Sequence, residues 1–217
     1  MQTVDQALDQ LLSCLSPLGA ERIPLAEAAG RVLAGDVRAA SPLPRFDNSA
    51  MDGYAVRSDD VRTAGEASPV RLRVVEDVPA GAGARRSIGK GQAARIMTGA
   101  LVPDGADAVL PVERTDRPHP MEGQPLPPEV LARRAVLAGE NVRRAGQDVA
   151  QGAVALPAGQ RLRSQDVGML AALGQAIVEV VRRPSVGLLS TGSELVPVDQ
   201  AAGAGHIHDS NRPALAA

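Results

Sequence analysis

The chain has 217 residues, of which 44% are apolar and only 1% aromatic, and its formal net charge is −2. The length allows one large domain or two modest ones, and Ala, Val and Leu side chains must fill the core. The small net charge gives no electrostatic reason to expect nucleic acid or an anionic membrane as a partner. No apolar run approaches the ~18 residues of a membrane span, and the N-terminus lacks a secretion signal, so we expect a cytoplasmic protein.

The N-terminal segment predicts two helices. Apolar residues at helical spacing over residues 3–15 indicate the first helix, with Thr3 as its N-cap. Cys14, the only cysteine, falls on the apolar side of this pattern, so we interpret it as a small buried residue. A second helix is expected over residues 25–33, where alanines, Val32 and Leu33 could form an apolar stripe.

The segment from residue 54 to residue 134 reads mostly as β structure. Val70, Leu72 and Val74 alternate with polar residues, and the connections are rich in Gly, Pro and Asp. Residues 117–128 carry five prolines and predict an exposed, extended loop. These features indicate a small β domain inserted between flanking elements.

The C-terminal part predicts a helix, a strand and the start of a new domain. A helix is expected over residues 164–173, with Ser164 as its N-cap and Gly174 as its stop. The strand AIVEVV and the Arg-Arg-Pro sequence that follows it mark a domain junction. The apolar run at residues 186–190 then predicts a strand of a parallel sheet, buried on both faces.

We therefore predict an α+β, multidomain fold. A linker domain of helices and short strands would comprise residues 1–45 and 139–183, and a mostly-β domain at residues 46–138 would be inserted into it. Residues 184–217 would begin an α/β domain. Because a doubly wound domain that stops after one strand cannot bury its sheet, the sequence suggests a fragment or a truncated gene.

The sequence PRFDNSAMDGYAV at residues 44–56 is the strongest chemical motif. It contains the only Phe and the only Tyr of the chain beside Asp47, Asn48 and Asp52. A loop dense in carboxylates and amides, anchored by two aromatic rings, suits a metal–phosphate or oxyanion ligand. An ordinary turn with Asp47 and Asn48 as Asx caps explains the same residues, and the motif alone leaves both interpretations open.

Two glycine turns are weaker candidates. Thr98 and Gly99 follow a short strand and could cradle an anion, although a structural turn is the more common meaning. In LLSTGSELV, Thr191, Gly192 and Ser193 could bind a phosphate at the start of a helix. Glu194, in the first turn of that expected helix, is either a dipole-stabilising carboxylate or a catalytic or metal-ligating one.

Four segments together resemble a known family. FDNSAMDGYAV, IMTGALVPDGADAVLPVE, GENVRRAGQDVAQG, and STGSELV followed by HIHDSNRPAL are similar, in that order, to the signature segments of the MoeA family, the molybdopterin molybdenumtransferases. The resemblance spans nearly the whole chain, and it implies that residues 184–217 are the start of an α/β molybdopterin-binding domain. Family members are considerably longer than this sequence.

The resemblance implies an enzyme that inserts molybdate into adenylylated molybdopterin and releases AMP, assisted by Mg²⁺. Family residues tied to activity match Asp52, Thr98, Asp148 and Glu194. Asp52 and Glu194 would hold Mg²⁺ or orient molybdate, Thr98 would donate a hydrogen bond to an oxyanion, and Asp148 would support the site. The cofactor-binding turn would comprise Thr191, Gly192 and Ser193, where Ser193 replaces an Asp found in many relatives.

The resemblance also implies partners and a rival interpretation. The family forms homodimers in which the β domain of one protomer meets the cofactor domain of the other, and the molybdopterin adenylyltransferase is a further expected partner. No nucleic acid or membrane partner is expected. The alternative is a non-catalytic dimerisation or scaffold module of the gephyrin E-domain type. A general phosphate-binding α/β protein would leave the first two motifs unexplained.

Overall fold

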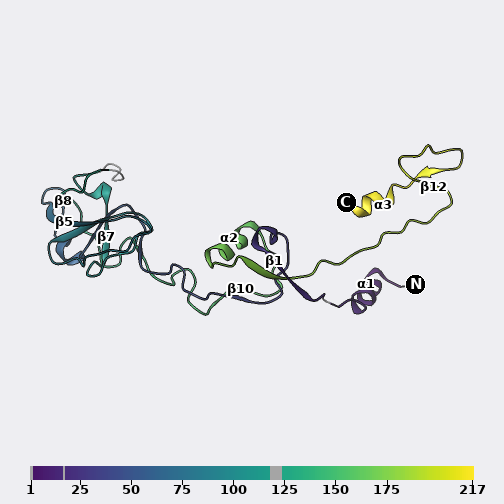
Figure 1. Ribbon diagram of the computed structural model, residues 1–217, viewed down its shortest axis with the longest axis horizontal. Coiled ribbons are helices and arrows are strands. Elements are labelled where there is room, and N and C mark those ends of the chain that lie inside the picture. Colours follow the sequence, from purple (N-terminus) through teal and green to yellow (C-terminus); the bar gives the residue numbers. More distant parts are fainter. Residues whose placement is uncertain (1, 17, 118–123) are drawn as a thin grey trace. The chain divides into compact units, whose positions relative to one another are not determined.

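The computed structural model describes residues 2–16, 18–117 and 124–217 and shows a sheet-rich chain with few helices (Figure 1). It divides into two compact units, one formed by Met1–Glu21 with Val181–Ala217 and the other by Arg22–Val180. None of the helices in the described part of the chain is long and apolar enough to cross a membrane. The three-domain division of residues 1–45 with 139–183, 46–138 and 184–217 stays a prediction.

The largest element is a five-stranded sheet, which confirms the β interpretation of residues 54–134. Its strands are β4 (Gly53–Val56), β5 (Val70–Val78), β6 (Gln92–Ile96), β7 (Ala108–Pro111) and β8 (Glu129–Ala132). Their order in the sheet is β7-β4-β6-β5-β8. All neighbouring pairs are antiparallel except β5 and β6, which run parallel.

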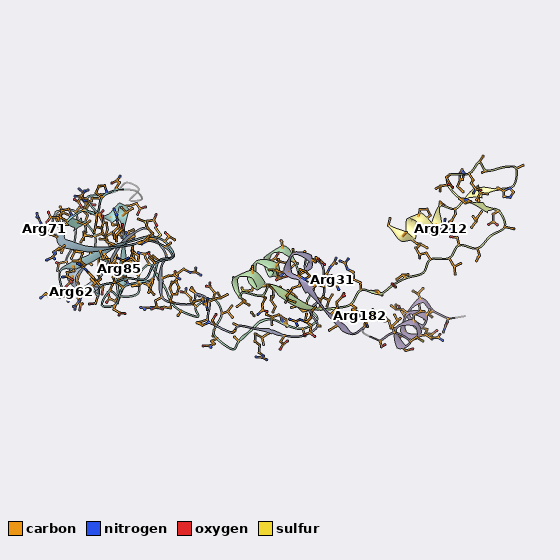
Figure 2. The ribbon with its side chains drawn as sticks, viewed as in Figure 1. Arg31, Arg62, Arg71, Arg85, Arg182 and Arg212 are labelled. Carbon is orange, nitrogen blue, oxygen red and sulfur yellow. The ribbon has the colours of Figure 1, made fainter. Side chains whose placement is uncertain are left out.

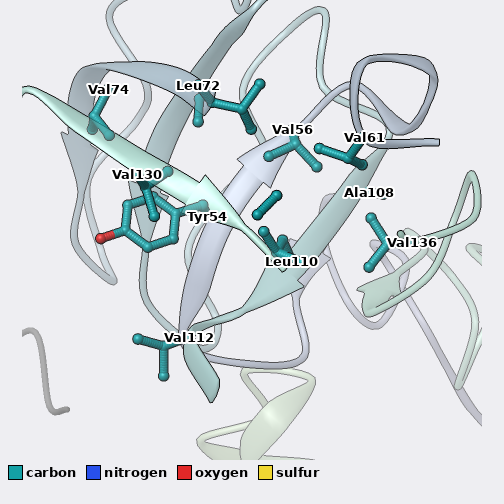
Figure 3. Packing of buried hydrophobic residues seen from close by; sticks show 12 residues of the cluster. Tyr54, Val56, Val61, Leu72, Val74, Ala108, Leu110, Val112, Val130 and Val136 are labelled. Carbon is teal, nitrogen blue, oxygen red and sulfur yellow. The ribbon is translucent and has the colours of Figure 1, made fainter. Parts of the chain in front are cut away.

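Strand β4 lies at the centre of packing on both faces of this sheet. Its four residues pair with β6 on one side and β7 on the other, and all four are buried. Tyr54 and Val56 pack with Leu72 and Leu110 on one face, as Figure 3 shows. Ala55 belongs to a second cluster on the opposite face. Because both faces are covered, the strand lacks the apolar–polar alternation of a half-exposed strand.

Strand β5 contributes to both clusters through an irregularity. Leu72 and Val74 lie in the first cluster, whereas Val78 lies in the second. These three residues are separated by even numbers of positions, so they would lie on one face of a regular strand. The register shift between Val74 and Glu76 moves the later residues to the other face, as a β-bulge does.

A separate core lies between the chain segments that flank the sheet. It is formed by buried residues that include Ile23, Leu33, Leu162, Leu170 and Val180. The elements around it are β1 (Ala20–Pro24) paired with β11 (Ile177–Val181), β2 (Val37–Arg38) paired with β10 (Val154–Leu156), the 3₁₀ turn η1 (Leu25–Glu27) and the helix α2 (Ser164–Ala172). The strand predicted at AIVEVV is therefore confirmed.

Two helix predictions in this core were wrong in detail. The only helical turn in residues 25–33 is η1, and Val32 and Leu33 form isolated β-bridges instead. Gly30, with a φ of +77°, interrupts the helix, and Leu33 donates its N–H to the Gln160 carbonyl. Helix α2 is capped by Arg163 and not by Ser164, since the Asp166 carboxylate accepts the Arg163 N–H at 2.8 Å. Gly174, at φ +76°, ends the helix as expected.

The unit formed by the two chain ends contains the N-terminal helix α1 (Val4–Ser13). Thr3 caps it by a reciprocal pair of hydrogen bonds with Gln6, which confirms the predicted start. The prediction that Cys14 is buried was wrong, because the thiol is exposed. The apolar face of the helix is exposed as well, including Leu8 and Leu11.

The strand predicted at residues 186–190 was also wrong. This segment has no regular secondary structure, and Val186 and Leu189 are 74% and 94% exposed. A buried parallel strand needs neighbouring strands and cover on both faces, and the described part of the chain places none beside this segment. The segment leads instead to β12 (Leu195–Val196), which pairs in parallel with β13 (Ile207–His208), and to α3 (Asn211–Ala216).

The predicted extended loop lies partly outside the described residues, which omit 118–123. In its described part Leu126 is exposed, as expected, but Pro127 is buried.

Arginines occur in both units, and Figure 2 labels six of them. Arg71 pairs with Glu129 of the neighbouring strand at 2.8 Å, and Arg212 lies 3.5 Å from Asp209. In these pairs a nearby carboxylate balances the positive charge locally.

Gly53 is the position in the sheet that tolerates a side chain least. A Cβ atom there would lie 2.1 Å from the Leu110 carbonyl oxygen, which belongs to the paired backbone and cannot turn away. We expect Gly53→Ala to lower the free energy of unfolding by about 3 kcal/mol, as overpacking of a core does. Gly83→Ala is the matched control, because a Cβ at Gly83 meets nothing within 4 Å. Equal denaturation midpoints for the two variants would contradict this account.

Candidate functional site

Asp52 and Thr98, which the sequence places in separate motifs, meet at one end of the sheet. Asp52 immediately precedes β4 and Thr98 closely follows β6, and these strands pair so that Gly53 lies opposite Ile96. The backbone N–H and the hydroxyl of Thr98 both donate to Oδ1 of Asp52, each at 2.7 Å. Both residues are exposed, so the pair is accessible to a ligand.

The Asp52 carboxylate is held firmly but is not neutralised. Its backbone carbonyl accepts the Val112 N–H at 3.0 Å, and the buried Gly53 follows it. Thr98 uses Oδ1, and within the described ranges no residue donates to Oδ2 or forms an ion pair with Asp52. An exposed, positioned carboxylate with a free oxygen is suited to a cation or to a protonated ligand group.

Asp47, in the same motif, has a structural role. Its Oδ1 accepts the Ala145 N–H at 2.8 Å and its Oδ2 accepts Nη1 of Arg144 at 2.6 Å. The Ala145 amide, followed by Arg144, lowers the pKa of Asp47 below its ordinary value. These bonds tie the motif to the segment after β9 (Val142–Arg143), which pairs with β3 (Asn48–Ser49). Asp47 is therefore structural, but it is not the local Asx cap of the alternative interpretation, because its partners Arg144 and Ala145 are distant in the sequence.

The expected anchoring of the motif by two aromatic rings holds only for one of them. Tyr54 is 1% exposed in the sheet core, and burial raises the pKa of its hydroxyl. Phe46 is 44% exposed. The loop is therefore fixed by strand pairing and by Tyr54 more than by Phe46.

Asp148, the third predicted site residue, bonds to neither Asp52 nor Thr98. Its Oδ2 pairs with Nη2 of Arg143 on the adjacent turn, and both side chains are partly exposed. The ion pair lies next to the β3–β9 pairing, so Asp148 helps to hold the ribbon that leads into the site motif. Its assignment as a site residue stays a prediction.

The predicted cofactor turn belongs to the other compact unit. Thr191, Gly192, Ser193 and Glu194 are all exposed, and the last two form a turn before β12 instead of the first turn of a helix. The Glu194 carbonyl accepts the Ile207 N–H at 2.8 Å, which links this turn to β13. No helix dipole acts on Glu194 here, so that part of the expectation was wrong.

A buried aspartate supports the same turn region. Asp209 accepts the Arg212 N–H at 3.1 Å, and this bond, followed by one from Ser190, lowers the pKa of Asp209. Ser190 directly precedes the predicted cofactor turn.

Two residues of the site were missed from the sequence. Asn141 adopts a left-handed backbone, with φ 59°, and donates its amide to the Val109 carbonyl at 2.9 Å. Its own carbonyl accepts the Ala50 N–H at 2.9 Å, so it connects β7 to the loop before Asp52. Ser49 is buried, and it forms hydrogen bonds both with Met51, next to Asp52, and with Gly99, next to Thr98. An Asn after Gly-Glu is a weak signal for a left-handed turn, whereas nothing local distinguishes Ser49.

No group of three or more His, Cys, Asp or Glu side chains that could hold a metal ion occurs among residues 2–16, 18–117 and 124–217. Any metal bound at Asp52 would therefore take most of its ligands from water or from a bound substrate.

The fold and the site define a sheet-rich protein that presents a positioned carboxylate–threonine pair at the end of two central strands. A family model described as the MoeA N-terminal region (domain I and II) matches residues 2–174, and the chain belongs to this family.

The known relatives that match this chain are longer than it is. Molybdopterin molybdenumtransferase 2 of Mycobacterium tuberculosis is 45% identical over 195 residues, which cover 90% of this chain and 46% of the relative. The molybdopterin molybdenumtransferase of Bacillus subtilis is 36% identical, over 96% of this chain and 47% of its own. The crystal structure of a molybdopterin biosynthesis MoeA protein from Pyrococcus horikoshii OT3 matches with a TM-score of 0.86 at 40% identity, over 97% of this chain and 54% of that one. The chain thus spans about half the length of these relatives.

The Asp47 bonds predict a pH-dependent contribution to stability. Because its folded-state pKa lies below the ordinary 3.8, the contribution is present above about pH 4 and is lost as the pH falls through the folded-state pKa. We expect Asp47→Asn to destabilise the chain at about pH 7 and less at about pH 3. Denaturant midpoints at the two pH values measure this. The exposed Asp59→Asn serves as control, and a difference for Asp47→Asn that stayed constant with pH would contradict the assignment.

Proposed function

We propose that this region acts in molybdenum cofactor biosynthesis as part of a molybdopterin molybdenumtransferase. The reaction would transfer molybdenum from molybdate to adenylylated molybdopterin, leave the metal on the dithiolene and release AMP. The hydrogen-bonded pair of Asp52 and Thr98 carries the proposal, because it joins two family segments into one exposed site at the end of the sheet. The names of the relatives at 45% and 36% identity support the assignment of the pathway.

The proposed architecture follows the predicted division. Residues 46–138 would form a β domain inserted into a linker domain of residues 1–45 and 139–183, and residues 184–217 would begin the molybdopterin-binding domain. The five-stranded sheet and the separate core of β1, β11 and α2 support the first two parts. The assignment of residues 184–217 is supported by the resemblance of the STGSELV segment to the family.

The residues around Asp52 fit a magnesium ion. Mg²⁺ keeps several water ligands and is usually held by one or two carboxylates together with substrate phosphates. Asp52 offers one free carboxylate oxygen in an exposed position, which suits such a site better than a fully enclosed one. When bound there, Mg²⁺ would offset the negative charge of the phosphate and molybdate oxygens. Asp52 of one protomer and Glu194 of a partner protomer are the proposed protein ligands.

We propose a role for Thr98 that differs from the one implied by the family resemblance. A threonine hydroxyl has a single proton, and Thr98 donates it to Asp52. We therefore assign Thr98 to orienting the carboxylate, so that Oδ2 of Asp52 faces the ligand. A hydrogen bond from Thr98 to an oxyanion would require the hydroxyl to turn away from Asp52.

Neutralising Asp52 should impair metal insertion without loss of the fold. The side chain is exposed and contributes little to packing. In the complete protein, Asp52→Asn should cost on the order of 2–4 kcal/mol of transition-state stabilisation, as removal of a preorganised electrostatic group does. The measurement is molybdate-dependent AMP release over a range of Mg²⁺ concentrations.

Thr98 variants separate the hydroxyl from the rest of the side chain. Thr98→Ser should retain most of the activity and Thr98→Val should lose it, whereas Val in place of the exposed Thr63 should change nothing.

For the preceding prediction on Asp52, normal turnover of Asp52→Asn at every Mg²⁺ concentration would show that Asp52 is not part of the site.

We also propose a homodimer, which is equally compatible with a non-catalytic scaffold module of the gephyrin E-domain type. The apolar face of α1 is exposed and supports an association surface, because proteins rarely leave a contiguous apolar patch open to water; it comprises Val4, Leu8, Leu11 and Leu12, with Leu15 exposed just after the helix.

Mixed dimers distinguish an enzyme with shared sites from a scaffold. If Asp52 of one protomer works with Glu194 of the other, co-refolding Asp52→Ala and Glu194→Ala proteins should restore AMP release to about a quarter to a half of the normal rate per dimer, since only one site of a mixed dimer is intact. A scaffold would dimerise without AMP release in any combination. Failure of mixing to exceed either parent would exclude the shared site.

A further inference from the structure

Ser49 makes hydrogen bonds to both the loop that carries Asp52 and the turn that carries Thr98. It lies in β3 and is 1% exposed. On one side, its backbone N–H donates to the Ala100 carbonyl at 3.0 Å, and its carbonyl accepts the Gly99 N–H at 2.8 Å. These two bonds fix the turn at Thr98 against β3.

On the other side, the Ser49 hydroxyl closes the turn before Asp52. Its Oγ donates to the Met51 carbonyl at 2.5 Å and accepts the Met51 N–H at 3.2 Å. The Met51 carbonyl belongs to the peptide group that leads into Asp52, so the hydroxyl sets the orientation of that peptide plane. The Val112 N–H holds the following carbonyl, that of Asp52 itself.

We propose that Ser49 is a positioning residue for the reaction: its hydroxyl holds the Asp52 carboxylate in register with Thr98. The inference rests on the proposed function of Asp52. Both hydrogen bonds of Thr98 to Asp52 require the two segments to stay within a few tenths of an ångström of their places. Without the hydroxyl, both polar groups of Met51 lose their partner, and the peptide between Met51 and Asp52 loses the bond that orients it.

The alternative is that Ser49 serves only the stability of the fold. Ser58 provides the matched control, because its hydroxyl also donates a hydrogen bond, to Oδ2 of Asp107 at 2.8 Å. Ser58 lies beyond the far end of β4 from Asp52. Ser49→Ala and Ser58→Ala therefore both remove a partly or fully buried hydroxyl from the same sheet region, but only the first touches the site.

Hydrogen exchange tests the geometry in this chain. In the unaltered protein, the amide protons of Met51 and Thr98 should exchange slowly, because both are hydrogen-bonded. Ser49→Ala should speed exchange of the Thr98 amide at least tenfold, whereas Ser58→Ala should leave it unchanged. Fast exchange at Met51 in the unaltered chain, or an unchanged Thr98 amide in Ser49→Ala, would overturn the proposal, and the first of these needs no variant to fold.

Kinetics of the complete protein test the role in the reaction. Ser49→Ala should lower kcat of AMP release about 10- to 100-fold with little change in KM, since small displacements of a positioned group have effects of that size. Combined with Asp52→Asn, it should cause no further loss, because the group that it positions is already gone. Ser49→Thr, which keeps the hydroxyl, should recover activity.

The outcomes separate this inference from the proposed function. An inactive Asp52→Asn together with a fully active Ser49→Ala would overturn the role of Ser49 alone. Equal fold-losses from Ser49→Ala with and without Asp52→Asn would show that Ser49 acts independently of Asp52, which also overturns it. A fully active Asp52→Asn would overturn the proposed function, and with it any role of Ser49 in this reaction.

Discussion

The close approach of β4 to β7 is the constraint on which the rest of the sheet and the site depend. Only a glycine fits at position 53, where the Leu110 carbonyl oxygen would lie 2.1 Å from a Cβ. That contact lets β4 form complete ladders with two neighbours while its residues fill both cores. Asp52 directly precedes Gly53, so its backbone is fixed by the same strand pairing. Asp52 is therefore exposed while its backbone carbonyl and its Oδ1 are both hydrogen-bonded, a combination that a loop alone seldom provides.

The scarcity of aromatic residues is compatible with this design. Alanines at positions 55, 93, 94 and 108 are fully buried in or beside the central strands, where larger side chains would force the layers apart. Valines supply most of the remaining volume, and their branched Cβ suits the pleated surface. Tyr54 is the one large ring in this core. It is the largest fully buried side chain among the described residues, and it lies on β4 close to Asp52.

The acidic residues around the site have separate tasks. Asp47 pairs with Arg144, just after β9, and Asp148 pairs with Arg143 at the end of β9, so both hold the ribbon and leave little charge for a ligand. Asp52 instead bonds to a threonine, which orients the carboxylate and leaves its charge uncompensated. The structure thus divides a cluster that looks uniform in the sequence into supporting groups and one group available for chemistry.

The sequence by itself determined those elements that depend only on interactions between neighbouring residues. The capping residues of α1, the stop at Gly174 and the apolar pattern of β5 need only neighbouring residues, and all were correctly predicted. The family segments also indicated Asp52 and Thr98. The predictions of a helix at residues 25–33 and of a strand at residues 186–190 were wrong. In the first segment the backbone bonds to distant residues instead of forming a helix, and the second segment has no neighbouring strand to pair with in the described part of the chain. The meeting of Asp52 and Thr98 across 46 positions, and the part that Ser49 plays between them, depended on strand register. Register is set by packing on both faces of the sheet, so only the tertiary structure could decide it.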